Sequence, residues 1–590
     1  MLVAIGLVVR LPTLRQPLVE AHGFRQTQTA YTALVFHQHG IDLLHPQIPV
    51  LGEPWALPFE FPLFQAIAAI VMDLGIGPDL AMRSTGLAFF ALTALLVFGF
   101  VRSHAGEVEA LASVCFFTFS PFSLIWSRTS LMEYMATAAA IAWCWAALSY
   151  RREPRRLVVA LAIAAGTVAC LVKITSAAFW VVPILLTPAA RGDGGRRIRS
   201  WARARLDPGL AAIVVVPLAV TAWWVRYSDH IKAENLQGKH LTSSALETWN
   251  YGTLAQRLDQ GSYTTIFDRI DPYITGGVIW GGLMLVALVL ARRRALWIGI
   301  AVTVVAPIAT FFNLYVVHEY YLCAVTPGIA MLLGVGLVSL VSRAGATGAH
   351  LVAATAGTLI VWGLTTLWLT HPYWGLAYSH LTPANNETLA TAASLAERSA
   401  PSDLVVMDGY DWSPEILYYA RRRGTMLRWP DPAVLQSVAP SYRVMVAADP
   451  LHGNLQLLRE FYWLEPLTPN ILRMSITRRG LPHADVQATT SAAAAREAET
   501  GGRTLLGSSS LSCTSGSSLT IPGGHGTAWI TFADNLPDAT RIAVGTGLAP
   551  LPAVAAIALQ PGGADDLRRA ETVTCSGTAT IKVTSVSVVG

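Results

Sequence analysis

Long apolar stretches recur between residues 80 and 370, and several approach the ~20 residues that an α-helix needs to cross a lipid bilayer. The interior of a bilayer offers no water to pair backbone amides, so such stretches cross it as helices whose hydrogen bonds are internal. The composition agrees, because 13% of the residues are charged, about half the share of a typical soluble domain. The chain is therefore predicted to be an α-helical polytopic membrane protein.

The apolar stretches divide into eleven predicted transmembrane helices. We expect them at 1–14, 80–101, 107–122, 131–150, 156–172, 174–190, 210–226, 272–291, 295–316, 321–342 and 348–370. A further stretch, 61–77, is predicted to lie in the outer membrane interface rather than to cross. If it crosses instead, the count becomes twelve and one of the other spans is wrong.

The first span is short, because Arg10 interrupts it after nine residues. It has neither the basic start nor the small-residue cleavage site of a signal peptide. We interpret it as a transmembrane helix whose start codon could have been assigned too late.

Arginines gather in three short loops, "RREPRR" (151–156), "RGDGGRRIRSWARAR" (191–205) and "ARRRA" (291–295). An excess of Lys and Arg in short loops marks the cytoplasmic side of a membrane protein. With the amino terminus inside, all three loops fall in the cytoplasm and the carboxyl terminus lies outside. A nucleic-acid-binding patch is the alternative, but loops wedged between apolar spans argue against it.

This topology predicts three domains. Residues 1–370 form the transmembrane domain, with an outer loop at 15–79 and a second one at 227–271. Residues 371–480 mix strand-like and helical runs, which predicts a small α/β domain outside the membrane. Residues 481–500 are expected to form a helix or linker, and 501–590 form a β-rich domain, read as a small sandwich.

The six cysteines fall into two groups. Cys115, Cys144, Cys170 and Cys323 lie in predicted spans or at their ends and are expected to be packing residues. Cys513 and Cys575 lie in the external tail, where an oxidising compartment allows them to form a disulfide. No CxxC motif and no His/Cys cluster with zinc spacing occurs in the sequence.

Polar residues crowd the stretch "LVEAHGFRQTQTA" (18–30), directly after the first span. His22, Arg25, Gln26 and Thr29 have the i, i+3, i+4, i+7 spacing of one helix face, and Glu20 precedes them. Ionisable residues at membrane depth are costly and usually functional. The alternative is an interfacial helix that wets its polar side.

Three more polar islands are predicted on the same side of the membrane. "CLVKITSA" places Lys173, one of only four lysines, in a turn between two spans, and "WSRTSLME" adds Arg128 and Glu133. "NLYVVHEYY" places His318, Glu319 and Tyr320 at an outer helix end. Structural capping and an aromatic belt are the alternatives for this last island. Arg binds phosphate as a flat fork and Lys as a point charge, so the islands suit an anionic lipid head group that carries a group for transfer.

The same residues resemble motifs of the type-C (GT-C) glycosyltransferases that use polyprenyl-phosphate sugars, particularly the protein mannosyltransferase and aminoarabinose transferase group. "EAHGFRQ" (20–26) is similar to an acidic–x–His–x–aromatic–Arg–Gln stretch of bacterial members. "FEFPLFQ" (59–65) resembles their Glu-Phe-Pro-Leu segment, and "HEYYLCAVTP" (318–327) their His-acid-Tyr-Tyr…Pro motif. "WSPEILYYARRRG" (412–424) resembles a segment in the tails of some relatives.

The resemblance implies the GT-C fold and a sugar transfer on the outer side of the bacterial cytoplasmic (inner) membrane. The transfer is expected to invert the anomeric centre of the sugar. Glu20 is the expected catalytic base. The expected ligands of the donor phosphate are Arg25, Lys173, His318 and Arg128. The expected substrate-binding residues are His22, Gln26, Glu60, Glu133, Glu319 and Tyr320.

Many relatives carry Asp where this chain has Glu20, and the first loop has no DxD motif or adjacent Asp–Glu pair. We therefore expect no required cofactor and no metal ligands, although a divalent metal stays an open alternative. The expected partners are the bilayer, a polyprenyl-phosphate sugar such as an arabinosyl or mannosyl donor, and an acceptor in envelope glycan or glycolipid assembly. A protein acceptor is the alternative, and a flippase or a non-enzymatic assembly factor is the alternative of another class.

Overall fold

The computed structural model describes residues 1–187, 207–371, 374 and 378–428, followed by short stretches within 442–589 that are mostly strands. The chain divides into two compact units. The first contains Met1–Pro49, Glu53–Ala390 and Ser413–Tyr418. The second contains Val50–Gly52, Thr391–Trp412 and Tyr419–Gly590.

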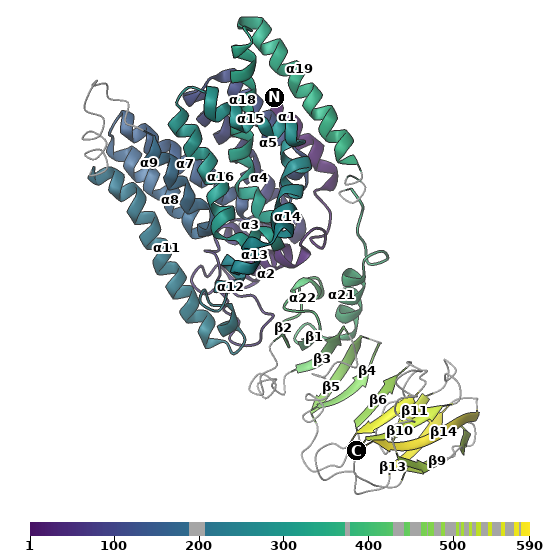
Figure 1. The fold of residues 1–590 in the computed structure, drawn as a ribbon. Coiled ribbons are helices and arrows are strands. Elements are labelled where there is room, and N and C mark those ends of the chain that lie inside the picture. Colours follow the sequence, from purple (N-terminus) through teal and green to yellow (C-terminus); the bar gives the residue numbers. More distant parts are fainter. Residues whose placement is uncertain are drawn as a thin grey trace. The chain divides into compact units, whose positions relative to one another are not determined.

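The first unit is helical (Figure 1). Its α-helices are α1 Leu2–Arg10, α2 Gly23–His39, α3 Leu63–Asp73, α4 Pro78–His104, α5 Glu107–Phe119, α6 Pro121–Trp126, α7 Glu133–Arg152, α8 Arg156–Ala177, α9 Val181–Leu186, α11 Pro208–Glu234, α12 Glu247–Tyr251, α13 Leu254–Leu258, α14 Gln260–Ile270, α15 Val278–Leu290, α16 Arg294–Thr310, α17 Phe312–Val317, α18 Thr326–Arg343 and α19 Gly348–Leu369. Short 3₁₀ or π turns join some of them, at η1 Leu11–Thr13, η2 Ala178–Trp180, η3 Gly238–Leu241, η4 Asp271–Thr275 and η5 Glu319–Ala324.

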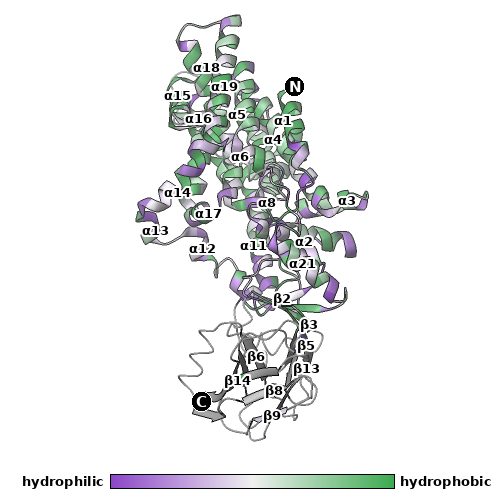
Figure 2. Ribbon diagram, turned by 90° about the vertical axis from the view of Figure 1, so that its right-hand side faces the viewer, coloured by the Kyte–Doolittle hydropathy of each residue, from purple (hydrophilic) through white to green (hydrophobic). Residues whose placement is uncertain are grey.

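Five helical stretches of the described chain are long and apolar enough to cross a membrane, and a bent pair makes a sixth. They are Pro78–His104, Arg156–Leu186, Pro208–Glu234, Thr326–Arg343, Gly348–Leu369 and the pair Gln260–Thr275 with Val278–Leu290. The chain is thus a mostly helical membrane protein, and Figure 2 shows hydrophobic residues along most of these helices. The remaining predicted spans hold shorter helices or, at α7, a helix of 20 residues that is not among these candidates, so the count of eleven stays a prediction.

The stretch Arg156–Leu186 reverses direction at Lys173. The Lys173 backbone is non-helical, with φ −158° and ψ 78°. Its ammonium contacts Glu133 at the first residue of α7, whereas the Thr187 carbonyl accepts from Arg151 near the end of α7. A straight helix from 156 to 187 would carry Thr187 more than 40 Å from Arg151. The backbone therefore confirms the predicted turn at Lys173 between two antiparallel segments.

A second sharp change of direction separates α14 from α15. The two halves of this pair are bent by 84°, and the joint contains Gly276 and Gly277 with φ of +86° and +121°. Backbone at these angles is open to glycine and costly for residues with a Cβ. The sequence therefore allows α15 to continue as an apolar span while α14 runs across its direction.

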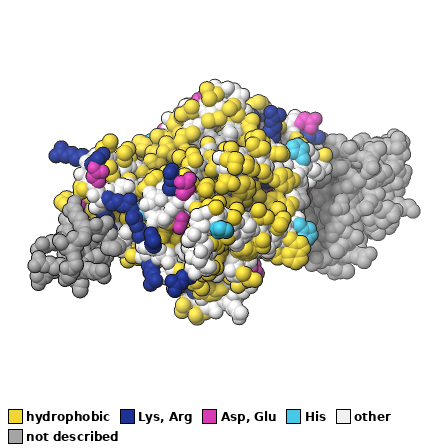
Figure 3. Space-filling view, turned by 90° about the horizontal axis from the view of Figure 1, so that it is seen from above, with side chains coloured by type: hydrophobic (Ala, Val, Ile, Leu, Met, Phe, Trp, Pro, Cys, Tyr) yellow, Lys and Arg dark blue, Asp and Glu magenta, His cyan; other side chains and the backbone are white. Residues whose placement is uncertain are grey.

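Close helix packing forms the centre of the first unit. The window of α18 that passes as a span is 72% buried, and a Cβ at its Gly336 would lie 1.9 Å from the Leu283 carbonyl oxygen of α15. Only glycine permits this approach. Figure 3 shows the molecule from above, with several Lys and Arg side chains gathered on part of that face. Exposed arginines stand at helix ends, where Arg152 is the last residue of α7, Arg156 the first of α8 and Arg294 the first of α16.

The second unit carries a small mixed sheet. Its strands have the order β2-β1-β3-β5-β4, with β1 parallel to β2 and β3 and the other pairs antiparallel. The elements are α21 Glu387–Arg398, which begins in the first unit, β1 Leu404–Asp408, α22 Glu415–Ala420, β2 Gly424–Met426, β3 Tyr442–Ala447, β4 Tyr462–Pro466 and β5 Ile471–Ile476. Parallel strands need a crossover, which accounts for the mixed helical and strand-like pattern of 371–480.

Two antiparallel sheets follow. One has the order β6-β12-β10-β14-β7, with β8 also on β14, and the other has the order β11-β13-β9. Their strands are β6 Asp485–Thr489, β7 Arg503–Leu506, β8 Ser509–Ser512, β9 Ser518–Ile521, β10 Thr527–Phe532, β11 Arg541–Val544, β12 Ala556–Gln560, β13 Glu571–Ser576 and β14 Thr580–Val589. The helix or linker expected at 481–500 is wrong at β6, which pairs with β12. The predicted Cys513–Cys575 disulfide lies outside the described side chains, while Cys115, Cys144, Cys170 and Cys323 are free thiols.

Candidate functional site

The helix expected after the first span begins at Gly23, one residue after His22. His22 caps it in the left-handed conformation, with φ 52° and ψ 47°. Glu20 lies in the turn before the helix, so the first loop presents its carboxylate separately from Arg25. Glu20 and Arg25 therefore belong to two neighbouring ionic clusters rather than to one.

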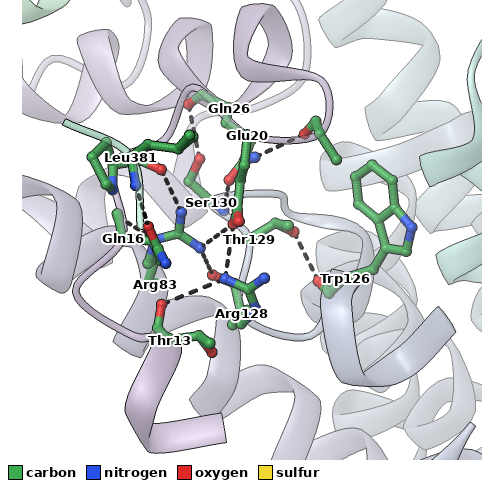
Figure 4. Close-up of polar contacts among 12 residues, drawn as sticks. Thr13, Gln16, Glu20, Gln26, Arg83, Trp126, Arg128, Thr129, Ser130 and Leu381 are labelled. Carbon is green, nitrogen blue, oxygen red and sulfur yellow. Dashed lines mark hydrogen bonds and ion pairs between the residues drawn. The ribbon is translucent and has the colours of Figure 1, made fainter. Parts of the chain in front are cut away.

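Glu20 forms the first ionic cluster with Arg83 and Arg128 (Figure 4). Its Oε1 accepts from Arg83 Nη1 at 2.7 Å and from Arg128 Nη1 at 2.9 Å. The arginine side chains are 0% and 2% exposed, and the Glu20 side chain is 12% exposed. A carboxylate held by two buried guanidinium groups is fixed in place.

Sequence reasoning missed Arg83, which lies in the apolar helix α4. Its other donors bind the Gln16 carbonyl at 2.8 Å, the Pro17 carbonyl at 2.7 Å and the Arg128 carbonyl at 2.9 Å. Arg83 thereby ties the first loop to the segment after α6. The available signal was an arginine inside a predicted span, which usually faces a polar partner.

The second ionic cluster contains Arg25, Lys173, Glu60 and Glu133. Glu60 Oε1 accepts from Lys173 Nζ at 2.7 Å and also from Arg25 Nη2. Glu133 Oε1 lies 3.1 Å from Lys173 Nζ, yet neither of its buried oxygens accepts a hydrogen bond from the described residues. Lys173 thus stands between two carboxylates and is bound more firmly to one of them.

Burial alone would raise the pKa of Glu60, but the charges of Arg25 and Lys173 outweigh it and hold that pKa well below its ordinary value. Burial likewise opposes the charge of Arg25, while the Glu60 carboxylate beside it raises the net pKa of Arg25. Both groups therefore remain charged across the physiological range.

An aromatic bridge of His22, Trp126, His318, Tyr320 and Tyr321 connects the two clusters. The His22 ring lies 5.7 Å from Trp126 and 5.2 Å from both His318 and Tyr320, measured between centroids. Tyr320 stacks on Tyr321 at 4.7 Å. Lys173 Nζ lies 4.8 Å from the Tyr321 ring centroid, a distance at which cation–π attraction operates. The predicted islands at 20–26, 126–133, 173 and 318–321 are thus brought together.

The imidazoles of the bridge are neutral at physiological pH. Burial, the neighbouring His22 imidazole and the positive charges of Arg25, Lys173 and Arg269 lower the pKa of His318 to about 4. Burial and Arg269 lower the pKa of His22. Neutral rings suit stacking and hydrogen bonding more than ionic binding of a phosphate.

Glu319 points to a partner outside both clusters. It lies 3.9 Å from Arg269 Nε, measured at Oε2, and burial raises its pKa. Arg269 also donates to the Tyr315 and Val316 carbonyls, at 2.9 Å each. Glu319 therefore adjoins the aromatic bridge without joining either ionic cluster.

Gln26 is occupied by the protein itself. Its Nε2 donates to the Ala21 carbonyl at 2.9 Å and its Oε1 accepts from the Ser130 amide at 3.2 Å. Ser130 Oγ in turn donates to the Gln26 carbonyl at 2.9 Å. Gln26 thus links α2 to the segment before α7, and its contact with substrate stays a prediction.

A carboxylate from the tail also belongs to the first unit. Glu415 lies beside Gly23, where its Oε1 is 2.1 Å from the position that a Cβ on Gly23 would take. Burial raises the pKa of Glu415. Tyr418 Oη donates to Asp79 Oδ1 at 2.8 Å, and residues 413–418 of the family-like segment belong to the first unit.

The two ionic clusters differ in net charge. Two arginines and one carboxylate leave the first cluster with +1, whereas two cations and two carboxylates leave the second neutral. No group of three or more His, Cys, Asp or Glu side chains among the described residues is arranged to hold a metal ion. The two clusters consist of carboxylates and cationic hydrogen-bond donors.

No family model matches the chain, and no curated protein matches its sequence. Solved structures match its fold. ArnT from Cupriavidus metallidurans bound to undecaprenyl phosphate aligns with a TM-score of 0.51 and 16% identity, covering 80% of this chain and 97% of that one. The same protein in the apo state gives 0.51 and 14%, over 80% and 96%.

The oligosaccharyltransferase of Archaeoglobus fulgidus in the apo form aligns with a TM-score of 0.50 and 10% identity, over 99% of this chain and 94% of that one. The chain is thus structurally similar to GT-C glycosyltransferases over most of its length. It has a GT-C-like fold.

Proposed function

We propose that the protein is a membrane glycosyltransferase that moves a sugar from a polyprenyl phosphate to an acceptor hydroxyl. The observation that carries this proposal is the pair of buried ionic clusters joined by the aromatic bridge in an otherwise apolar helical unit. Buried charges are costly within a membrane, and the ionisable residues that occur there are usually functional. The fold supports the donor class, because one structure with this fold is bound to undecaprenyl phosphate.

Lys173 and Arg25 are the proposed ligands of the donor phosphate. Both cations are bound to Glu60, so a phosphate must compete with carboxylates. Glu133 lies 3.1 Å from Lys173 Nζ but accepts no hydrogen bond from the described residues, so an N–H of the Lys173 ammonium can turn to a phosphate oxygen while the ion pair with Glu133 stays in place. Two cationic donors also stabilise the charge that develops on the leaving phosphate.

Glu20 is the proposed base. Its Oε1 is held by Arg83 and Arg128, which leaves Oε2 to receive the proton of the acceptor. The acceptor hydroxyl becomes strongly acidic as its oxygen bonds to the sugar. Proton transfer therefore comes late, and a well-oriented carboxylate suffices to accept the proton.

The acceptor oxygen bonds to the anomeric carbon, and the bond from that carbon to the phosphate oxygen breaks. The electron pair stays on the phosphate, and the acceptor proton passes to Glu20. Attack from the face opposite the phosphate inverts the anomeric centre.

The reaction is proposed on the extracytoplasmic side of the bacterial cytoplasmic membrane. The arginine-rich ends of α7, α8 and α16 are expected to face the cytoplasm. Lys173 and Glu133 lie at the opposite end of α7 from Arg151. The second ionic cluster is therefore far from the arginine-rich helix ends. We propose that the carboxyl-terminal tail is extracytoplasmic as well, as the predicted eleven-span topology requires.

Reconstituted protein given defined polyprenyl-phosphate sugars tests the proposal. We expect release of polyprenyl phosphate, stimulated by an acceptor drawn from a panel of glycans, glycolipids and hydroxyl-bearing peptides. Translocation of the intact donor across the vesicle, without release, would identify a flippase instead. If neither release nor translocation occurs, an assembly factor is the better description.

A further inference from the structure

A small polar cavity lies behind the second ionic cluster. It is lined by α2, the loop that follows it and the start of α3, and its size is that of about one water molecule or one hydroxyl group. Its polar lining residues are Arg25, Gln28, Thr29, Thr32, Glu60 and Gln65. The cavity therefore touches Arg25 and Glu60, and its other polar lining residues are neutral hydrogen-bonding groups beside an apolar wall of Pro46, Ile48, Leu57, Phe59 and Pro62.

Gln28 directs an amide donor that the described residues leave unpaired. Arg25 Nη1 donates to Gln28 Oε1, which fixes the orientation of the amide. Gln28 Nε2 is buried without a hydrogen-bond partner in this part of the chain, and the residue is 1% exposed. Buried polar atoms are nearly always paired in native proteins, so this atom is expected to have a partner in the working complex.

Gln65 supplies the complementary group. The residue is 7% exposed, and its Oε1 is buried with no partner among the described residues. The hydroxyls of Thr29 and Thr32 donate to the Arg25 and Gln47 carbonyls. Each can therefore only accept a further bond from whatever enters.

We propose that this cavity receives one hydroxyl group of the donor sugar, an inference that rests on the proposed function. A hydroxyl accepts one bond and donates another, so it pairs with both Gln28 Nε2 and Gln65 Oε1. An ammonium group has no acceptor for Gln28, and a methylene pairs with neither amide. The site therefore selects a neutral hydroxyl at this position over an amino or deoxy carbon.

The position of the cavity favours the donor over the acceptor. Arg25 and Glu60 belong both to its lining and to the second ionic cluster. A phosphate at Arg25 and Lys173 places the attached sugar next to the cavity mouth. A hydroxyl near the anomeric carbon is then within reach.

The test compares donor hydrolysis by the full-length protein on a polyprenyl-phosphate sugar and on its complete set of monodeoxy analogues. We expect one deoxy position to lower kcat/KM by at least ~100-fold, because sites built to bind a hydroxyl reject analogues that lack it. Gln65→Leu should reduce that ratio at least ~10-fold and leave the ratios at other positions unchanged. Gln65→Asn serves if Gln65→Leu does not fold.

Gln47→Leu is the matched control. Gln47, in the first loop, also has a buried Oε1 with no partner among the described residues but does not line the cavity, so its variant should keep the wild-type ratios. Active wild-type protein whose deoxy ratios do not respond to Gln65→Leu would overturn the inference and leave an ordered water only. A response confined to deoxy acceptors would also overturn it, in favour of the acceptor. Absence of turnover by wild type on any donor would instead overturn the proposed function itself.

Discussion

Glu20 Oε1 lies 2.7 Å from the guanidinium of Arg83, a fully buried residue of an apolar helix. This pair joins the predicted catalytic carboxylate to the membrane-spanning part of the unit. Arg83 also binds three backbone carbonyls. The position of the proposed base therefore depends on a residue that no sequence motif contains.

Arg83→Gln should destabilise the protein by about 3–5 kcal/mol, because it removes one partner of a buried ion pair and leaves carbonyls unpaired. Thermal unfolding in detergent measures the loss. Arg102→Gln is the control, since Arg102 is 59% exposed and lies 3.7 Å from Glu107, and exposed pairs contribute about 0–1 kcal/mol. Equal shifts in the two variants would contradict the structural role of Arg83.

Lys173→Met should weaken binding of polyprenyl phosphate by about 10- to 100-fold, the range expected for one lost hydrogen bond to a charged group. Titration of purified protein with polyprenyl phosphate measures the affinity. Lys239→Met, at an exposed position, should bind as wild type does. Unchanged affinity in Lys173→Met would remove Lys173 from the proposed phosphate site.

The pH dependence of stability should contain a contribution from His318. Its folded pKa of about 4 lies below the ~6.5 of an unfolded histidine, so the unfolded chain binds more protons between these values. Stability is then lost as the pH falls from ~6.5 towards 4. His318→Gln should show a shallower fall of the melting temperature over this window, whereas His230→Gln, at an exposed histidine, should follow wild type. Identical slopes in all three proteins would contradict the burial of a neutral His318.

Gly86→Ala should destabilise the protein by about 1–3 kcal/mol through overpacking. A Cβ on Gly86 of α4 would lie 2.4 Å from the Thr129 carbonyl oxygen, and a backbone atom cannot rotate away. Because Thr129 follows Arg128, we also expect slower donor turnover. Gly357→Ala, with nothing within 4 Å of the new methyl group, should be neutral or stabilising, and equal behaviour of the two variants would show that α4 does not pack closely here.

The sequence predicts the order of the helices, because helix formation depends on local pattern. Lys173 illustrates this, since a lysine between two apolar runs predicts a turn, and the backbone confirms it. The carboxyl-terminal sheet was predicted in kind but not in extent, because the pairing of β6 with β12 joins residues 485 and 560.

The partners inside the site could not be predicted, because packing between distant segments sets them. The spacing of His22, Arg25, Gln26 and Thr29 indicates one helix face, yet Arg25 contacts Glu60 and Gln26 contacts Ser130. Helical periodicity fixes the direction of a side chain on its own helix and does not identify which segment lies opposite. Arg83 was missed for the same reason.

Release of polyprenyl phosphate by Glu20→Gln tests the central claim most directly. The substitution also removes a charge from two buried arginines, so unfolding and polyprenyl phosphate binding are measured on the same preparation, with Glu20→Asp as a carboxylate-retaining variant and Glu107→Gln as an exposed control. In folded protein that still binds polyprenyl phosphate, we predict that Glu20→Gln lowers release by about 100- to 10,000-fold, that Glu20→Asp keeps part of the activity and that Glu107→Gln keeps all of it. Release by folded Glu20→Gln at the wild-type rate would contradict the account and move the base to Glu53, Glu60 or Glu133.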